Sequence, residues 1–258
     1  MDFVHLHVHS HYSLLNGLNK IKPLVKAAKA RGLKALALTD YGAMYGAIEF
    51  YEACQAAGVK PIIGLETFIA TRSRQGKDPE LDKKVTSLVL LAENFTGYKN
   101  LMLLSSLGQV EGLFYGKPRI GKDLLQKYHH GIIALSGSID GEVPALLKNG
   151  NYTEAKRIAF QYNQLFGKDN FYLELQDHPA IPGQMEVNTK LVQLSKETNI
   201  PLVVTRDVHY LNPADAEAQD ILRCIAQGWK VEQIDREDYR QVDRSLNTGA
   251  EIASRFRH

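Results

Sequence analysis

Short apolar runs alternate with longer amphipathic segments along almost the whole chain. The apolar runs predict β-strands at residues 3–9, 35–39, 61–66, 87–92, 131–136, 171–175 and 201–205. The amphipathic segments predict helices at residues 20–30, 45–57, 98–107, 152–166, 183–197 and 213–227. Strands that alternate with helices are typical of βαβ units and a parallel sheet. About seven such units, without a glycine-rich phosphate-binding turn, favour an α/β barrel over a doubly wound sheet.

Two internal stretches fall outside this pattern. Residues 71–84 are charged and lack apolar periodicity, which predicts an exposed loop. Residues 108–121 are irregular and carry Lys117 and Arg119, with Lys122 directly after them. This basic cluster is either a solvated loop or a contact for the phosphates of a nucleic acid.

The chain becomes polar after Trp229 and ends without a clear final element. Its length of 258 residues is a natural size for one α/β barrel. We therefore expect a single domain over residues 1–258, with the barrel at about 1–228 and a C-terminal extension at 229–258, cut from a longer protein.

Composition narrows the class of protein. Hydrophobic residues make up 44% and charged residues 23% of the chain, as in ordinary soluble globular proteins. The net charge of +2 indicates no general affinity for nucleic acid, so any DNA contact would need a local patch. Cys54 and Cys224 lie far apart in apolar contexts, which predicts buried, reduced thiols in a cytoplasmic protein. No apolar run approaches the roughly 18 residues of a membrane span, so no membrane association is expected.

Two short strings near the ends of the chain carry histidines at strand spacing. His7 and His9 lie two residues apart in the first apolar run, and Asp207 and His209 lie two apart after the last one. Side chains two apart on a strand point to the same face. If the two strands are neighbours in a barrel, four side chains with metal-ligand chemistry converge on one point.

Other polar candidates also follow predicted strands. Asp40 follows the second strand, Glu66 ends the third and His178 follows the sixth. Functional groups of α/β barrels lie at these carboxyl ends. Mixed imidazole and carboxylate ligands suit Zn²⁺, Mn²⁺ or Fe²⁺ better than Mg²⁺, and such ions activate water against phosphoesters. Asp207, His209 and Asp40 are the candidate catalytic residues of that chemistry.

Several strings resemble a known family. The HxHxxYS opening at residues 7–13, the LTD turn at 38–40 and the PIIGxE string at 61–66 are similar to the PHP (polymerase and histidinol phosphatase) domain. More narrowly, YGAIEFY, KPRI, YLELQDH and DVHYL resemble the PHP domain of bacterial DNA polymerase III α subunits. The resemblance implies a distorted TIM-like (βα)7 barrel of the PHP type, with about nine ligands around up to three ions.

Carried over position by position, the resemblance implies six metal ligands: His7, His9, Glu66, His178, Asp207 and His209. Asp40 also matches, in a supporting position. Four positions depart from the family pattern, with Asn16 in place of Asp, Tyr41 and Ser87 in place of His, and Ser138 in place of Cys. Neutral amide and hydroxyl groups are weak ligands, so we expect one or two ions and not a complete trinuclear site.

Three functions are compatible with this pattern. The first is an accessory PHP domain of a replicative polymerase, a DNA-directed DNA polymerase, with a degenerate metal site and a structural or partner-docking role. Its partners would be the remaining polymerase domains, primer-template DNA and a proofreading exonuclease subunit. The second is an active metal-dependent phosphoesterase that gives a 3′→5′ proofreading exonuclease. The third, a separate phosphatase related to histidinol phosphatase, is disfavoured by the polymerase-like strings.

Overall fold

The computed structural model describes residues 3–233 and 235–256, and their strands form one eight-stranded sheet. The strands are β1 (Ala35–Leu38), β2 (Lys60–Ala70), β3 (Val85–Ala92), β4 (Leu113–Phe114), β5 (Lys117–Ile120), β6 (Ile132–Leu135), β7 (Phe171–Gln176) and β8 (Leu202–Thr205). The helices are α1 (Ile21–Ala30), α2 (Ala47–Ala57), α3 (Phe95–Gly112), α4 (Lys122–Tyr128), α5 (Glu142–Lys148), α6 (Tyr152–Phe166), α7 (Gln184–Thr198), α8 (Ala216–Gln227) and α9 (Gly249–Arg255), with 3₁₀ turns η1 (Pro213–Asp215) and η2 (Tyr239–Gln241).

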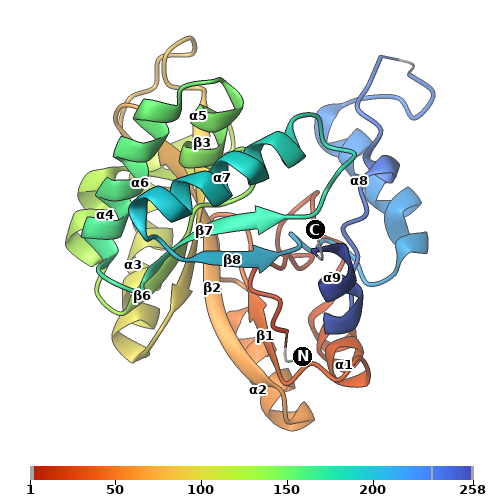
Figure 1. The fold of residues 1–258 in the computed structure, drawn as a ribbon. Helices are drawn as coiled ribbons and strands as arrows, with labels where there is room; N and C mark the ends of the chain where they lie inside the picture. Colours follow the sequence, from red (N-terminus) through yellow and green to blue (C-terminus); the bar gives the residue numbers. More distant parts are fainter. Residues whose placement is uncertain (1–2, 234, 257–258) are drawn as a thin grey trace.

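The sheet curls into a barrel that the N-terminal segment closes. The strand order is β4-β5-β2-β3-β6-β7-β8, with β1 paired to β2 (Figure 1). His5 bridges Leu36 of β1, and Val8 bridges Val208, which follows β8. Residues 5–8 therefore lie between β1 and the segment after β8, which confirms the predicted α/β barrel of distorted TIM-like form.

The expectation of a purely parallel sheet was wrong. β3 runs antiparallel to both of its neighbours, β2 and β6. The segment at 71–84, which links β2 to β3, contains no helix, so the chain returns as a hairpin instead of crossing the sheet. The stretch at 108–121, expected to be irregular, ends α3 and forms the hairpin of β4 and β5.

The prediction of a continuous strand over residues 3–9 was also wrong. This segment makes isolated bridges, and the backbone N–H of Val8 donates to the Thr39 hydroxyl at 2.8 Å. A side-chain acceptor thus takes a place that a carbonyl holds in a regular ladder. The two-residue spacing still points His7 and His9 to one side, because Val8 between them is buried in the opposite direction, among α1 and β1.

Helices pack on the barrel through single apolar faces. In α1, the buried positions are Ile21, Leu24, Val25 and Ala28, spaced as one stripe of a helix. They form a core cluster with Phe50 of α2. A larger cluster joins β2, β3, β6 and β7 to α3, α5, α6 and α7. No helix in the described ranges is both long and apolar enough to cross a membrane.

The basic cluster near β5 does not form a free cationic surface. Arg119 is only 1% exposed, and its guanidinium donates to the carbonyls of Gly112, Asp82, Arg74 and Gly76. It therefore anchors the 71–84 loop, and the hypothesis that its side chain contacts DNA is wrong.

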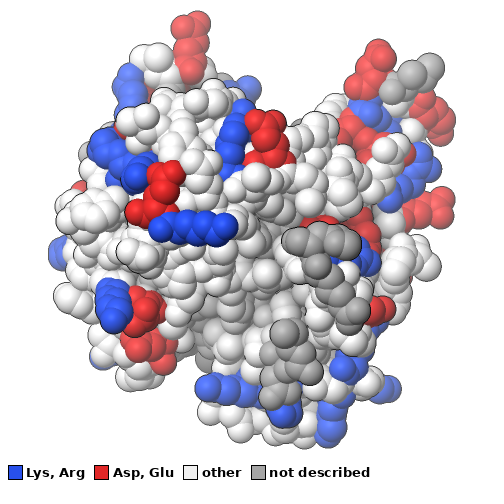
Figure 2. All heavy atoms as spheres, viewed as in Figure 1, with Lys and Arg blue, Asp and Glu red and all other residues white. Residues whose placement is uncertain are grey.

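The other two basic side chains are also engaged. Lys122 pairs with Glu142 at 2.7 Å, and the ammonium of Lys117 lies 5.6 Å from the ring centre of Phe68. Figure 2 shows basic and acidic side chains side by side over the surface of α4–α6, where Arg157 also pairs with Glu154. This face presents mixed charge instead of a basic stripe.

The C-terminal extension returns to the barrel. Ser245 bridges Tyr210, and the N–H of Leu246 donates to the Tyr210 carbonyl at 3.0 Å. The fully buried Arg206 pairs with Asp243 at 2.7 Å. Residues 243–246 are thereby held beside the segment that carries Asp207 and His209.

Candidate metal centre

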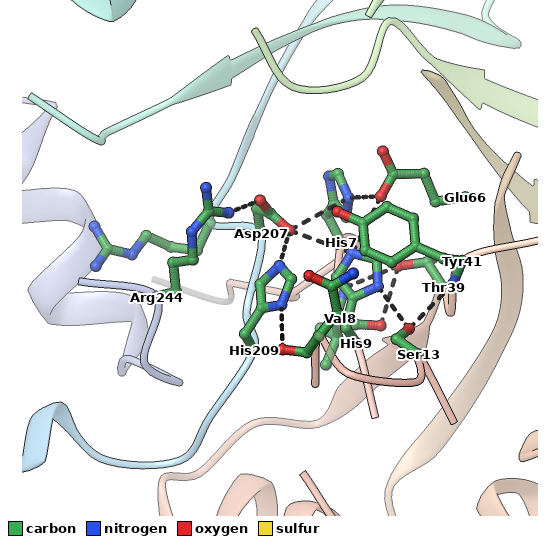
Figure 3. A network of polar contacts seen from close by, with 12 residues as sticks. His7, Val8, His9, Ser13, Thr39, Tyr41, Glu66, Asp207, His209 and Arg244 are labelled. Carbon is green, nitrogen blue, oxygen red and sulfur yellow. Dashed lines mark hydrogen bonds and ion pairs between the residues drawn. The ribbon is translucent and has the colours of Figure 1, made fainter. Parts of the chain in front are cut away.

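Four of the predicted ligands meet inside one end of the barrel. One ligand atom from each of His7, His9, Glu66 and Asp207 lies within 4.8 Å of the others, and all four residues are buried (Figure 3). The two histidines come from the N-terminal segment, Glu66 from β2, and Asp207 from the turn after β8. Because the N-terminal segment lies between β1 and the residues after β8, the fold brings together side chains 200 positions apart in the sequence.

The spacing within this four-residue cluster is that of ligands around one ion. His7 Nε2 lies 2.8 Å from Glu66 Oε2, and His9 Nε2 lies 3.1 Å from the same oxygen. Asp207 Oδ1 lies 3.2 Å from His9 Nε2 and 3.6 Å from His7 Nε2. Tetrahedral ligands at metal bonds of about 2.0–2.1 Å are separated by roughly 3.3 Å. Two imidazoles and two carboxylates at these separations fit a single divalent ion.

Residues behind the imidazoles fix which nitrogen faces the cluster. His7 Nδ1 lies 2.7 Å from Glu174 Oε1, and His9 Nδ1 lies 3.0 Å from the Ser13 hydroxyl. Ser13 donates its own proton to Asp40 Oδ1 at 2.6 Å, so its oxygen accepts from His9. The Nδ1 atoms therefore carry hydrogens, and each ring turns its Nε2 toward the carboxylates of the cluster.

This arrangement calls for a cation between the groups. In their neutral forms, His7 and His9 would face the carboxylate oxygens with Nε2 lone pairs, and those oxygens also offer only lone pairs. His9 Nε2 is buried and makes no hydrogen bond, although two carboxylate oxygens lie close to it. A divalent ion or added protons would resolve this repulsion, so the donor set itself supports a divalent metal site.

The charge state of the cluster follows from the same contacts. Burial alone would lower the pKa of His7, but the carboxylates of Glu174 and Glu66 outweigh it and raise that pKa to about 10. Burial would raise the pKa of Glu66, but the charge and hydrogen bond of His7 lower it far below its usual value. Burial lowers the pKa of His9. In the absence of a metal ion, the positive charge of protonated His7 thus partly offsets the negative charge of the carboxylates in the cluster.

His209 lies at the edge of the cluster. Its Nε2 is 2.9 Å from Asp207 Oδ1, and its Nδ1 is 3.1 Å from the Asn16 carbonyl. Its ring stacks on His9 with centroids 4.5 Å apart. Burial holds the pKa of His209 well below its usual value, so the ring is neutral near pH 7. Asp207 itself adopts a left-handed backbone with φ of 50°, a strained conformation that Asp tolerates better than most residues.

Two further predicted residues, His178 and Asp40, also lie outside the four-residue cluster. His178 Nε2 donates to the Arg206 carbonyl at 2.8 Å, and its Nδ1 is buried without a partner. Asp40 lies behind His9 and accepts hydrogen bonds from Ser10 and Ser13. Asp40 is therefore placed to orient the HxH segment rather than to touch a ligand in the cluster.

The four positions that depart from the family pattern carry neutral side chains, which are weak metal ligands. Tyr41 stacks on His9 with centroids 4.1 Å apart, and burial raises the pKa of its phenol, which keeps it neutral. The side-chain oxygen of Asn16 accepts from Arg223. The hydroxyl of Ser87 is buried without a partner, and the structure shows only a backbone hydrogen bond for Ser138.

Sequence reasoning missed two charged residues that contact the cluster. Glu174 lies in the middle of buried β7, and a charged residue in an apolar strand was the available signal. Arg244 pairs with Asp207 Oδ2 from the C-terminal extension (Figure 3). No sequence feature marks Arg244 as a site residue, because nothing in the polar stretch after Trp229 indicates that the chain returns to the barrel.

An α/β barrel with a buried histidine–carboxylate cluster at one end is the arrangement of metal-centred barrel proteins. The chain belongs to the PHP domain family, whose profile matches residues 5–178. It is 42% identical to the DNA polymerase III subunit alpha of Treponema pallidum over 259 residues, covering 100% of this chain and 22% of that protein. The same subunit of Borreliella burgdorferi is 46% identical over 229 residues, covering 88% of this chain and 20% of that protein.

The chain thus spans about a fifth of the length of the curated relatives it matches. A solved structure from Bifidobacterium adolescentis is 14% identical, with a TM-score of 0.48 over 80% of this chain and 87% of that one. The predicted PHP membership is confirmed, and the matched relatives are the predicted polymerase subunit.

Proposed function

We propose that this chain is the PHP domain of a bacterial DNA polymerase III α subunit, within a cytoplasmic protein that synthesises DNA on a primer-template. The observation that carries this proposal is 42% identity to such a subunit along the whole chain. In this proposal residues 1–258 form one domain, the barrel ends near 228, and the extension leads to the polymerase domains.

The reading frame tests this proposal directly. The gene should continue beyond His258 into polymerase domains, and the complete product should extend a primer. A frame that stops at His258, or a complete product without primer extension, would contradict it.

Within the polymerase, we propose that the barrel mainly supports and docks other parts, namely the remaining polymerase domains and a proofreading exonuclease subunit. The hydrogen bonds of Arg119 and Arg206 stabilise the barrel without a metal. Chelation should therefore shift the melting temperature by less than about 4 °C, equivalent to roughly 1 kcal/mol. Unfolding on chelation would show that the metal is structural.

We also propose that His7, His9, Glu66 and Asp207, with His209 beside them, hold one divalent ion, of which Zn²⁺, Mn²⁺ and Fe²⁺ suit the donor set best. A bound ion supplies Lewis-acid polarisation of a phosphoester and a lowered pKa for water. The chain's own residues would orient the imidazoles through Glu174 and Ser13 and exclude bulk water by burial. His209, whose Nε2 lies 2.9 Å from Asp207 Oδ1, would help to orient that carboxylate.

This donor set favours a second candidate function, 3′→5′ hydrolysis of DNA. The test is degradation of a primer with a mismatched 3′ end in the presence of Mn²⁺ or Zn²⁺. Asp207→Asn should abolish it. Asp169→Asn is a matched control, because Asp169 also has positive φ, at 64°, but is exposed. Equal rates in the parent and Asp207→Asn would exclude the activity at this site.

A further inference from the structure

Asp207 uses its two carboxylate oxygens for different partners. Oδ1 faces the imidazoles, at 2.9 Å from His209 and 3.2 Å from His9. Oδ2 forms an ion pair with the guanidinium of Arg244. The side chain of Asp207 is only 4% exposed and that of Arg244 19%, so water screens this pair little.

Backbone hydrogen bonds hold Arg244 beside Asp207. Its carbonyl accepts from the N–H of His209 at 2.9 Å, and its own N–H donates to the Tyr210 hydroxyl at 2.9 Å. The preceding residue, Asp243, is paired with buried Arg206. The guanidinium is therefore positioned by the fold, and is not a surface side chain that happens to reach the site.

A cation bound at Asp207 Oδ1 would lie close to this guanidinium, because the two oxygens belong to one carboxylate. Two positive charges would then share one negative group in a buried site, where their repulsion is strong. Arg244 already neutralises Asp207, which also weakens that carboxylate as a ligand.

We propose that Arg244 is an internal cation that competes with a divalent metal ion for Asp207, so that the C-terminal extension lowers the metal affinity of the cluster. This inference rests on the proposed metal site at His7, His9, Glu66 and Asp207. It gives the extension a role that is separate from its connection to other domains.

The test measures Zn²⁺ affinity of the 258-residue chain by competition with a chromophoric chelator, without any assay of activity. Arg244→Met should bind Zn²⁺ at least tenfold more tightly than the parent. Arg223→Met is the matched control, because Arg223 contacts Asn16 instead of a ligand, and its affinity should stay within twofold. Millimolar methylguanidinium should weaken binding to Arg244→Met and leave the parent unchanged.

The outcomes separate this inference from the metal site itself. If the parent and Arg244→Met bind equally, and His7→Ala/His9→Ala binds no metal, the site stands and competition by Arg244 is overturned. Weaker binding by Arg244→Met also overturns it, since Arg244 would then support Asp207 as a ligand. If neither protein binds Zn²⁺, both the metal site and the inference fail. Should Arg244→Met not fold, Arg244→Gln keeps a polar side chain without the charge, with the same expected result.

Discussion

Glu174 Oε1 lies 2.7 Å from His7 Nδ1, directly behind the imidazole that faces Glu66. Gln176 and Thr205 also donate to this oxygen of Glu174. A carboxylate behind a metal-ligating histidine fixes the ring orientation and makes the opposite nitrogen a better ligand. The contact thus links a residue within β7 to the proposed metal centre.

Glu174→Gln should weaken metal binding by about tenfold, the lower end of the range for such supporting residues. The amide keeps the shape of the side chain but is a poorer acceptor for the His7 N–H. Zn²⁺ affinity by chelator competition measures this. Glu186→Gln, an exposed change on α7, is the control, and an unchanged affinity in Glu174→Gln would show that His7 needs no carboxylate support.

The raised pKa of His7 predicts a pH dependence of the metal-free protein. Its folded value of about 10 lies above the ordinary 6.5, so the charged ring stabilises the folded state. This contribution is fully present below pH 6.5 and is lost as the pH rises through 10. In excess chelator, the unfolding free energy of the parent relative to His7→Gln should therefore fall between pH 7 and pH 10, measured by urea denaturation.

A difference between parent and His7→Gln that stays constant over this pH range would contradict the charged state of His7. The same proton must leave when a metal binds at Nε2. Zn²⁺ affinity of the parent should accordingly rise with pH, by up to about tenfold per unit, while His7 remains protonated in the free protein.

Arg119→Met should lower the free energy of unfolding by about 3 kcal/mol or more. The change removes a buried guanidinium and leaves several loop carbonyls without donors, at roughly 1–3 kcal/mol each. Lys122→Met, which breaks a partly exposed pair with Glu142, should cost less than about 1 kcal/mol. Similar losses in the two variants, measured by urea denaturation, would show that the 71–84 loop does not depend on Arg119.

Restoring the family pattern should increase metal loading. Tyr41→His with Asn16→Asp and Ser87→His adds two imidazoles and one carboxylate, and we expect more bound metal per chain by mass spectrometry. Arg223 contacts Asn16 and would pair with the new carboxylate, so the gain should be larger when Arg223→Met is added. If the triple variant binds no more metal than the parent, these positions are not the missing ligands.

The sequence by itself determined the barrel class and most of its helices, and its six candidate ligands include the four residues of the cluster. Apolar periodicity predicted α6 at its observed bounds, since helix-forming amphipathic faces are local properties. The two-residue spacing of His7 and His9 predicted a common direction, even though the expected strand is reduced to isolated bridges. Cys54 and Cys224 are buried and free, as predicted.

Only the tertiary structure decided which distant groups share the site. β3 returns antiparallel after the 71–84 loop, and the residue that anchors this loop, Arg119, comes from another hairpin. Arg244 reaches Asp207 because the extension pairs with Tyr210, a long-range contact with no local pattern. Apolar periodicity indicates which face of a helix or strand is buried. It does not report which buried charges meet, because that depends on the closure of the whole barrel.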